Sequence, residues 1–266
     1  MEEHGPLTPP AHIDPFSMQG KRVLVIGGTR GIGRAIALQL ASAGADVVVN
    51  FVRDIEAAER LVAAASQAGL RLQTIRADVS SDKALERFVT EVEQHFADLS
   101  TLVFAAATGV HRPIEELSGR HFDFTFALNV KAFLALVKRF TPKMPPGSSI
   151  IALSSEGAGR AMPQYSLVGA SKGALESLCR HLAVELAARG IRVNVLSPGT
   201  VRTDAWNALP DADRRLREAA ERSPIRRLVT AEEVAFAARF LACDASAGMT
   251  GHTLVVDGGA RIVGSA

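Results

Sequence analysis

A phenol and an amine lie close together near the middle of the chain. Tyr165, the only tyrosine, precedes Lys172 by seven residues. Residues seven apart return to the same face of an α-helix, so both groups can be directed into one pocket. A phenol can donate a hydrogen bond to a developing oxyanion, and a fixed cation nearby favours the same charge. We therefore predict Tyr165 and Lys172 as catalytic residues; the alternative is a loop aromatic and a surface cation.

A glycine-rich loop is the second chemical signal. An apolar run over residues 23–26 leads into GGTRGIG, which an amphipathic stretch follows. Glycines in a turn from strand to helix let the backbone approach a pyrophosphate, which then lies at the positive end of the helix. An ordinary tight turn is the alternative, but the position after the first strand favours a dinucleotide. The predicted contacts are Gly27, Thr29, Arg30, Gly31, Ile32 and Gly33.

The end of the second apolar run indicates which dinucleotide fits. A carboxylate there would bind the ribose hydroxyls of NAD, whereas a 2′-phosphate needs a cation. The position is Phe51, and Arg53 follows two residues later. Arg53 and Arg30 can form a charge-assisted clamp on a phosphate, so we predict NADP(H) as cofactor. Taken singly, each arginine could equally be a solvated charge, and we interpret Asp54 as a helix N-cap.

Alternating strands and helices must position these groups. Helical patterns are present at 32–43, 55–67 and 83–96. Between them lie apolar, β-branched runs typical of buried parallel strands. These runs are 23–26, 47–51, 72–75, 102–105, 150–153, 193–196 and 253–256. The pattern predicts an α/β fold, a single doubly wound Rossmann-like domain with a mostly parallel seven-stranded sheet and helices on both faces.

Composition and charge limit the partners. The net charge of +2 is mixed along the chain, so we expect neither nucleic acid nor a membrane surface as partner. No stretch approaches the ~20 apolar residues of a membrane-spanning helix, and no apolar signal segment opens the chain, so we expect a cytoplasmic protein. We interpret Cys179 and Cys243 as buried small hydrophobes, and the scattered histidines predict no metal.

Two segments lie outside this regular pattern. Residues 1–19 contain four prolines, so we expect a mobile N-terminal arm, with the domain over 20–266. Residues 202–227 hold Trp206, Leu209 and Pro210, and are our candidate for a lid over an acyl chain. An acidic carrier protein could dock on six of the seven arginines of the lid, namely Arg214, Arg215, Arg217, Arg222, Arg226 and Arg227, but interleaved carboxylates favour a self-paired, solvated helix. Thr230 and Glu233 indicate a capping box that opens the next helix.

From about residue 20 to residue 263 the chain resembles the short-chain dehydrogenase/reductase superfamily. Its members share one Rossmann-like domain with a catalytic tyrosine and lysine. The motifs that carry the resemblance are Gly27-x3-Gly31-x-Gly33, Asp78-Val79, Asn129, Ser155, Pro198-Gly199-Thr200-Val201-Arg202-Thr203 and Val256-Asp257-Gly258-Gly259. The resemblance implies catalytic roles for Asn129 and Ser155, and a homotetramer. It also implies cofactor contacts at Asp78, Val79, Ala105, Lys172, Pro198, Gly199, Val201 and Thr203.

Departures from the superfamily pattern indicate one branch. Most members place the tyrosine four residues before the lysine, where this chain has Val168. The spacing Tyr-x6-Lys resembles the enoyl-acyl-carrier-protein reductases, and the similarity is greatest to the NADPH-using type III enzymes. The family's Asn-Asn-Ala-Gly reads FAAA at 104–107, which implies a more apolar wall. Ser155 stands where many NADH-using members have a second tyrosine, so a hydrogen-bonding spectator is its alternative role.

The displaced tyrosine suits conjugate reduction. A phenol three residues earlier is shifted by about 4.5 Å along a helix axis, and hydride transfer to the β-carbon of an enoyl thioester creates charge on a more distant oxygen than ketone reduction does. We therefore predict an NADPH-dependent reductase of trans-2-enoyl thioesters of acyl carrier protein or coenzyme A, in fatty-acid biosynthesis. Tyr165 stabilises the enolate and Lys172 binds the ribose. The alternatives are a 3-oxoacyl or other carbonyl reductase of the same superfamily, and a non-catalytic NADP(H)-binding sensor.

Overall fold

The computed structural model describes residues 14–204, 206 and 211–263. Residues 1–13 of the expected N-terminal arm, and Leu209 and Pro210 of the expected lid, lie outside these ranges. Within the described part of the arm, Met18 is fully buried and its amide donates to the Ala43 carbonyl at 3.0 Å. The packed fold therefore already includes Met18.

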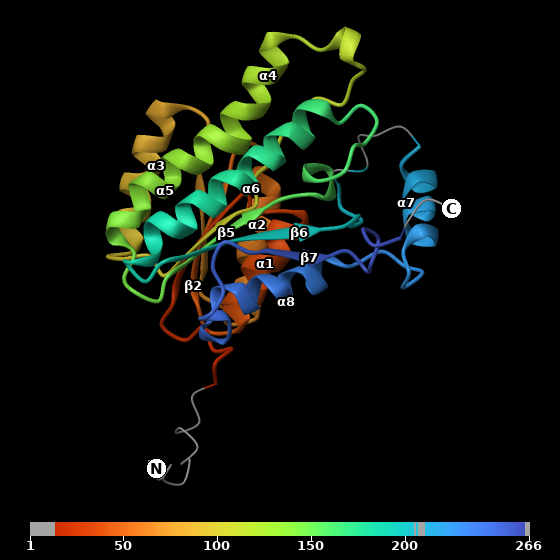
Figure 1. Cartoon of the computed structure of the whole chain (residues 1–266). Coiled ribbons are helices and arrows are strands. Elements are labelled where there is room, and N and C mark those ends of the chain that lie inside the picture. Colours follow the sequence, from red (N-terminus) through yellow and green to blue (C-terminus); the bar gives the residue numbers. More distant parts are fainter. Residues whose placement is uncertain (1–13, 205, 207–210, 264–266) are drawn as a thin grey trace, which may run out of the picture.

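Seven strands form one sheet (Figure 1). They are β1 (Arg22–Ile26), β2 (Asp46–Phe51), β3 (Leu72–Arg76), β4 (Thr101–Phe104), β5 (Ser149–Leu153), β6 (Arg192–Pro198) and β7 (Thr253–Val256). Their order is β3-β2-β1-β4-β5-β6-β7, and every neighbouring pair is parallel. The seven-stranded sheet predicted from the apolar runs is confirmed, and it is parallel throughout.

Helices cover both faces of this sheet (Figure 1). They are α1 (Gly31–Ser42), α2 (Ile55–Gln67), α3 (Asp82–His95), α4 (Gly119–Phe126), α5 (Phe133–Phe140), α6 (Ser166–Ala187), α7 (Ala212–Arg222) and α8 (Ala231–Ala242). Buried residues of α1, α2 and α8 form one core cluster with one face of the sheet, and those of α3, α5 and α6 form another with the opposite face. Successive residues of β1 alternate between the two clusters, as a strand period of two requires.

Local signals account for several helix starts. The Asp54 carboxylate accepts from the Ala57 amide at 2.9 Å, which confirms the N-cap of α2. The Glu233 amide donates to the Thr230 hydroxyl at 3.2 Å, and the Thr230 amide donates to the Glu233 carboxylate at 2.9 Å. This confirms the capping box of α8. Short 3₁₀ turns lie at Ile114–Glu116, Thr141–Lys143, Glu156–Ala158 and Asp244–Ser246.

Both cysteines are buried with free thiols, as interpreted from the sequence. In the part of the chain that the structure describes, no helix is long and apolar enough to cross a membrane, and no group of three or more His, Cys, Asp or Glu residues could hold a metal ion.

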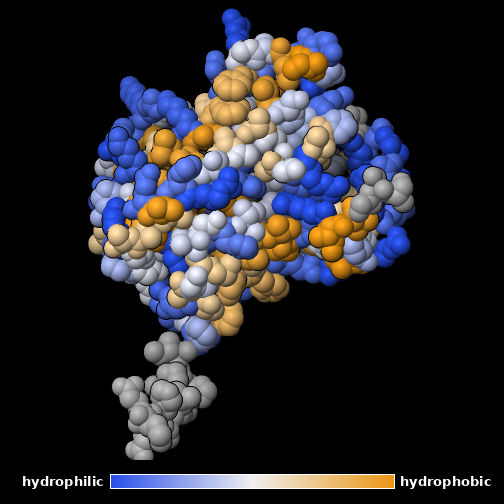
Figure 2. Space-filling model, in the orientation of Figure 1, coloured by the Kyte–Doolittle hydropathy of each residue, from blue (hydrophilic) through white to orange (hydrophobic). Residues whose placement is uncertain are grey.

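Figure 2 shows apolar residues gathered over α4 and the segment before it. Exposed apolar side chains there include Ile114, Phe122 and Phe124.

Candidate functional site

The residues predicted from the sequence meet at one edge of the sheet. Parallel strands end at the same edge, and each of β1 to β6 leads there into a predicted cofactor or catalytic segment. These segments begin at Gly27, Arg53, Asp78, Ala105, Ser155 and Gly199. The strand order turns back between β1 and β4. Such a switch point opens a ligand-binding crevice at the carboxyl ends of the strands.

The glycine loop after β1 fits a pyrophosphate. Gly27 and Gly31 have φ values of +78° and +54°, a backbone conformation that favours glycine. A Cβ at Gly33 would overlap the Gly27 carbonyl oxygen, so the loop closes tightly on the start of α1. The first turn of α1 contains no acidic residue, and the Arg30 side chain makes no capping hydrogen bond. The amides of this helix start are therefore available to an anion.

Three arginines lie at or shortly after the ends of β1, β2 and β3, the region in which the 2′-phosphate is predicted. Arg30 and Arg53 are exposed, and among the described residues neither forms a side-chain hydrogen bond or ion pair. Arg76, the last residue of β3, pairs with Phe51, and its Nε donates to the Val52 carbonyl at 3.0 Å. Sequence reasoning missed Arg76 because the pairing of β2 with β3 brings it beside Arg53. The sequence signal that could have indicated Arg76 was its position directly after the third apolar run.

Asp78 and Val79 follow β3 at the same edge. The Asp78 carboxylate accepts from the amide and the hydroxyl of Ser80, at 3.0 and 2.6 Å. Val79 is buried in the core, at 2% exposure. Asp78 therefore offers polar atoms at the surface of the crevice, whereas Val79 anchors the turn.

Tyr165 is the N-cap residue of α6. Its hydroxyl lies 3.1 Å from the Ser155 hydroxyl, and its ring meets the His111 ring edge-on with centroids 5.2 Å apart. A Cβ at Gly157 would overlap the Tyr165 ring, so the phenol packs directly on the backbone there. Gln164, directly before it, has φ of +58°, in the left-handed region. Burial raises the pKa of Tyr165 and the Ser155 hydrogen bond opposes that shift, so the phenol remains protonated at neutral pH.

Lys172 lies two turns further along α6 and is only 4% exposed, so the surface-cation alternative is wrong. Its Nζ donates to the Leu153 carbonyl at the end of β5, at 2.7 Å. Burial lowers the pKa of Lys172 to about 8, against the opposing effects of Cys179 and Glu176. Lys172 is therefore a buried group that is mainly cationic at neutral pH.

Val168 fills the position where most family members carry tyrosine. It is buried at 5% exposure, and a Cβ at Gly109 would overlap its Cγ2. The space beside the loop after β4 is therefore occupied by a methyl group. The hydroxyl nearest to Ser155 comes from Tyr165 instead.

Asn129 lies in a π-helical segment, Ala127–Ala132, which continues α4 into α5. Its amide group pairs with the backbone of Thr108 through both atoms, at 2.9 and 2.8 Å, and also donates to the Ser171 hydroxyl at 2.9 Å. Asn129 is fully buried. These bonds hold the loop after β4 against α6, so Asn129 positions that loop.

The loop after β6 lies against the glycine loop. The Gly199 amide donates to the Val256 carbonyl at 2.9 Å, and a Cβ at Gly31 would come within 3.3 Å of Thr203. Pro198 ends β6, and Val201 forms a bridge to Val229. The two loops, both predicted to contact the cofactor, therefore adjoin.

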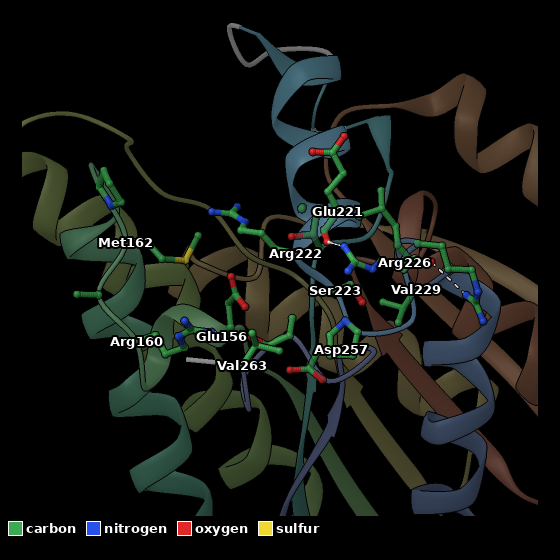
Figure 3. Close-up of a pocket in the computed structure, with 18 residues that line it drawn as sticks. Glu156, Arg160, Met162, Glu221, Arg222, Ser223, Arg226, Val229, Asp257 and Val263 are labelled. Atoms are coloured by element: carbon green, nitrogen blue, oxygen red, sulfur yellow. Dashed lines mark hydrogen bonds between the residues drawn. The ribbon is translucent and has the colours of Figure 1, made fainter. Parts of the chain in front are cut away.

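A cavity of about 760 Å³ opens beside these loops, in the size range of small-molecule sites (Figure 3). Its walls are the segment 156–163, the end of α7 with the turn that follows, and 257–263. Tyr165 lies on a smaller hollow of about 350 Å³, which shares Arg160, Ala161 and Met162 with the larger cavity. Sequence reasoning missed Arg160 and Met162; their nearness to Tyr165 in sequence was the available signal.

The described part of the expected lid contains α7 and the turn after it. Arg214 pairs with Asp211 at 3.0 Å and Glu218 at 2.8 Å, and Arg202 pairs with Asp213 at 3.1 Å. The self-paired interpretation is confirmed for these residues. The Trp206 indole donates to the Val201 carbonyl at 2.9 Å. Arg222, in contrast, lines the cavity.

Known proteins resemble this chain over most of its length. A family model described as enoyl-(acyl carrier protein) reductase matches residues 27–261. The chain is 36% identical to 1-cyclohexenylcarbonyl-CoA reductase of Streptomyces collinus, over 90% of this chain and 86% of that protein. It is 32% identical to a hydroxynaphthalene reductase-like protein of Metarhizium brunneum, over 92% and 96%. A short-chain dehydrogenase/reductase structure from Serratia marcescens superposes with a TM-score of 0.86 at 33% identity, over 91% and 98%.

Proposed function

Because the chain belongs to the short-chain dehydrogenase/reductase superfamily, we propose that it is an NADPH-dependent reductase of trans-2-enoyl thioesters. Membership in the superfamily implies an oxidoreductase that uses a nicotinamide dinucleotide. The observation that carries the finer proposal is the Tyr165 hydroxyl 3.1 Å from Ser155, while Val168 fills the usual tyrosine position. The family model described as an enoyl reductase supports the same reaction class.

The proposed chemistry assigns a distinct task to each side chain. A bound NADPH would supply the hydride that reduces the β-carbon of the enoyl group. Tyr165 donates a hydrogen bond to the thioester oxygen as the double-bond electrons move onto it, and Ser155 orients that hydroxyl. Lys172 stabilises the developing anion through its buried charge. Asn129 keeps the loop after β4 in place. A proton from water then adds to the α-carbon, which completes reduction of the double bond.

The cofactor proposal rests on the glycine loop and the nearby cations. Uncapped amides at the start of α1 fit a pyrophosphate. Arg30, Arg53 and Arg76 would bind the 2′-phosphate, for which a planar guanidinium is well suited. Asp78 and the backbone of Val79 would contact the adenine, and Ala105, Pro198, Gly199, Val201 and Thr203 would border the rest of the dinucleotide.

A thioester panel tests the function. The protein is incubated with NADPH and either crotonyl-CoA or acetoacetyl-CoA, and NADPH absorbance is followed. We expect oxidation with the enoyl compound. Oxidation with the 3-oxo compound alone would refute enoyl reduction, and NADPH binding without consumption across the panel would favour the sensor alternative.

Carbonyl reduction is the second candidate function. The relatives named as hydroxynaphthalene reductase-like protein and versicolorin reductase 1, at 32% and 30% identity, favour it. A hydroxynaphthalenone added to the panel separates the two candidates. Faster turnover of that ketone than of any enoyl thioester would favour the carbonyl reaction.

A further inference from the structure

We propose that the large cavity recognises an oxyanion on the substrate, with Arg222 as the main ligand and Arg160 and Arg226 as supporting cations. This inference rests on the proposed function, since it concerns the substrate of the same site. The three arginines come from separate segments, namely the end of α7, the turn after it and the segment before Tyr165. Figure 3 shows the Arg222 side chain reaching across the cavity toward Met162.

Among the residues that the structure describes, the ion pairs around the cavity leave these three cations without a carboxylate partner. Arg227 binds Glu233 through two hydrogen bonds, at 2.8 and 2.6 Å. Arg160 and Arg226 instead donate to the carbonyls of Ala260 and Glu221, at 2.9 and 2.8 Å, so each retains its full charge. Within the described ranges, Arg222 makes no side-chain hydrogen bond or ion pair. All three guanidinium groups can therefore bind a ligand.

The carboxylates of the cavity do not balance this charge. Asp257 accepts from the amides of Gly259 and Arg261, at 2.8 and 3.0 Å, and its carboxylate lies 3.8 Å from the Arg261 guanidinium. Among the lining residues, Glu156 and Glu221 then face three arginines. The lining therefore carries a surplus positive charge, and the three arginines that supply it are exposed and accessible to an anion.

The backbone holds the cationic wall in place. Ser223 is buried at 4% exposure, and its hydroxyl donates to the Gly258 carbonyl at 3.2 Å, which ties the end of α7 to the segment after β7. Arg226 has φ of +56°. A left-handed backbone at a residue with a side chain persists only where the surrounding structure enforces it. The turn that contains Arg226 is thus fixed, and it directly follows Arg222 at the end of α7.

The wall opposite α7 adds three apolar residues beside Arg160, namely Ala161, Met162 and Pro163. A ligand that fits both walls combines an apolar portion with an oxyanion. Two parts of an acyl thioester can supply the oxyanion: a phosphate on the pantetheine-bearing carrier or a carboxylate on the acyl group. The guanidinium chemistry is the same for both.

The test compares Arg222→Gln with Arg217→Gln, which makes the same change at an exposed position of α7 that does not line the cavity. KM and kcat are measured with enoyl thioesters of coenzyme A and of N-acetylcysteamine, the latter lacking phosphate, and with acyl groups that do or do not end in a carboxylate. We expect Arg222→Gln to raise KM about tenfold for compounds that carry the recognised oxyanion, with little change in kcat.

A rise confined to coenzyme A thioesters assigns the oxyanion to the carrier phosphate, and a rise confined to carboxylated acyl groups assigns it to the acyl chain. Equal KM values for parent and Arg222→Gln with all four compounds would overturn the inference, as would an equal effect of Arg217→Gln. Calorimetric titration with the corresponding saturated thioesters needs no turnover. Absence of enoyl reduction would therefore refute the proposed function, while a charge-dependent binding loss in Arg222→Gln would still support the oxyanion site.

Discussion

The Tyr165 phenol owes its position to neighbours that are small or rigid. Gly157 leaves room for its ring, His111 meets that ring edge-on, and Ser155 lies within hydrogen-bond distance of its hydroxyl. At the usual family position, Val168 is packed against Gly109, so a larger side chain there would have to displace the loop after β4. Several contacts therefore determine where the Tyr165 hydroxyl lies, and a single substitution can test each of them.

Removal of the phenol oxygen should separate chemistry from cofactor binding. Tyr165→Phe keeps the ring that packs on Gly157 and loses the donor for the substrate oxyanion. We expect kcat to fall about a hundredfold or more, while the Kd of NADPH stays close to that of the parent. Steady-state kinetics and fluorescence titration measure the two quantities. Equal turnover of variant and parent would remove Tyr165 from the mechanism.

The cation at Lys172 should impose a pH limit on activity. Its lowered pKa of about 8 means that the group is protonated below that pH and loses its charge above it. The raised pKa of Tyr165 keeps the phenol protonated over the same range. We expect kcat/KM, which reports the free enzyme, to decline as pH rises through this value. A profile that stays flat well above pH 8 would contradict the assigned role of Lys172.

Arg53 should decide between the two dinucleotides. Arg53→Ala removes a guanidinium from the region of the 2′-phosphate, so we expect the Kd of NADPH to rise about tenfold and that of NADH to change little. Arg60→Ala is the matched control, because Arg60 pairs with Glu56 on α2. An unchanged ratio of the two Kd values in Arg53→Ala would refute the phosphate clamp.

At the scale of elements, α8 and α7 contribute in different ways. α8 packs on α1 and buries an apolar face in the core, whereas α7 buries only Leu216 and carries its charges in pairs on its surface. Ser223 and the bridge between Val201 and Val229 fasten the chain on either side of α7. Helix α7 therefore buries little apolar surface while the chain is fastened before and after it, which is the arrangement expected of the proposed lid.

The capping box of α8 provides a test of element stability. Thr230→Ala removes the hydroxyl that accepts from the Glu233 amide, and we expect the free energy of unfolding to fall by about 1 kcal/mol. Urea denaturation measures the change. Glu232→Gln, in the same first turn but outside the box, should have a smaller effect. Equal losses for the two variants would show that the box itself contributes little.

The whole molecule brings separate segments together at the carboxyl edge of the sheet. Because all seven strands are parallel, the loop after each of β1 to β6 leads into at least one helix before the chain returns to the next strand, and these helices cover both faces of the sheet. The two edge strands of the sheet are β3 and β7. On the β7 side, Val255 is 39% exposed and Phe236 of α8 is 57% exposed. We propose that this side contributes to a homo-oligomer, with a tetramer as the expected state.

Phe236→Asp should weaken that association. A buried charge would replace an apolar contact at the proposed interface, so we expect sedimentation to show smaller species than the parent forms. Ile114→Asp, which places the same charge at an exposed residue distant in sequence, is the comparison variant. A parent protein that sediments as a monomer would contradict the proposed assembly.

Near neighbours in the chain were enough to predict much of this molecule. The seven apolar runs, the glycine turn, the N-cap at Asp54 and the Thr230 box depend on residues a few positions apart, whose periodicity and hydrogen bonds are local. They predicted the fold and placed Tyr165, Lys172 and the cofactor loops at one edge. Strand boundaries moved by one or two residues, since pairing with a neighbouring strand extends β6 to Pro198.

Contacts between residues far apart in the chain were not predictable in this way. Strand pairing brings Arg76 to the end of β2, His111 contacts Tyr165 from another loop, and the Asn129 amide group is hydrogen-bonded to the backbone of Thr108. Arg160, Arg222 and Arg226 face one cavity only because the end of α7 lies near the segments that follow β5 and β7. Side-chain packing and long-range hydrogen bonds depend on the complete arrangement of layers, so the shape and charge of the substrate site emerge only when the chain is folded.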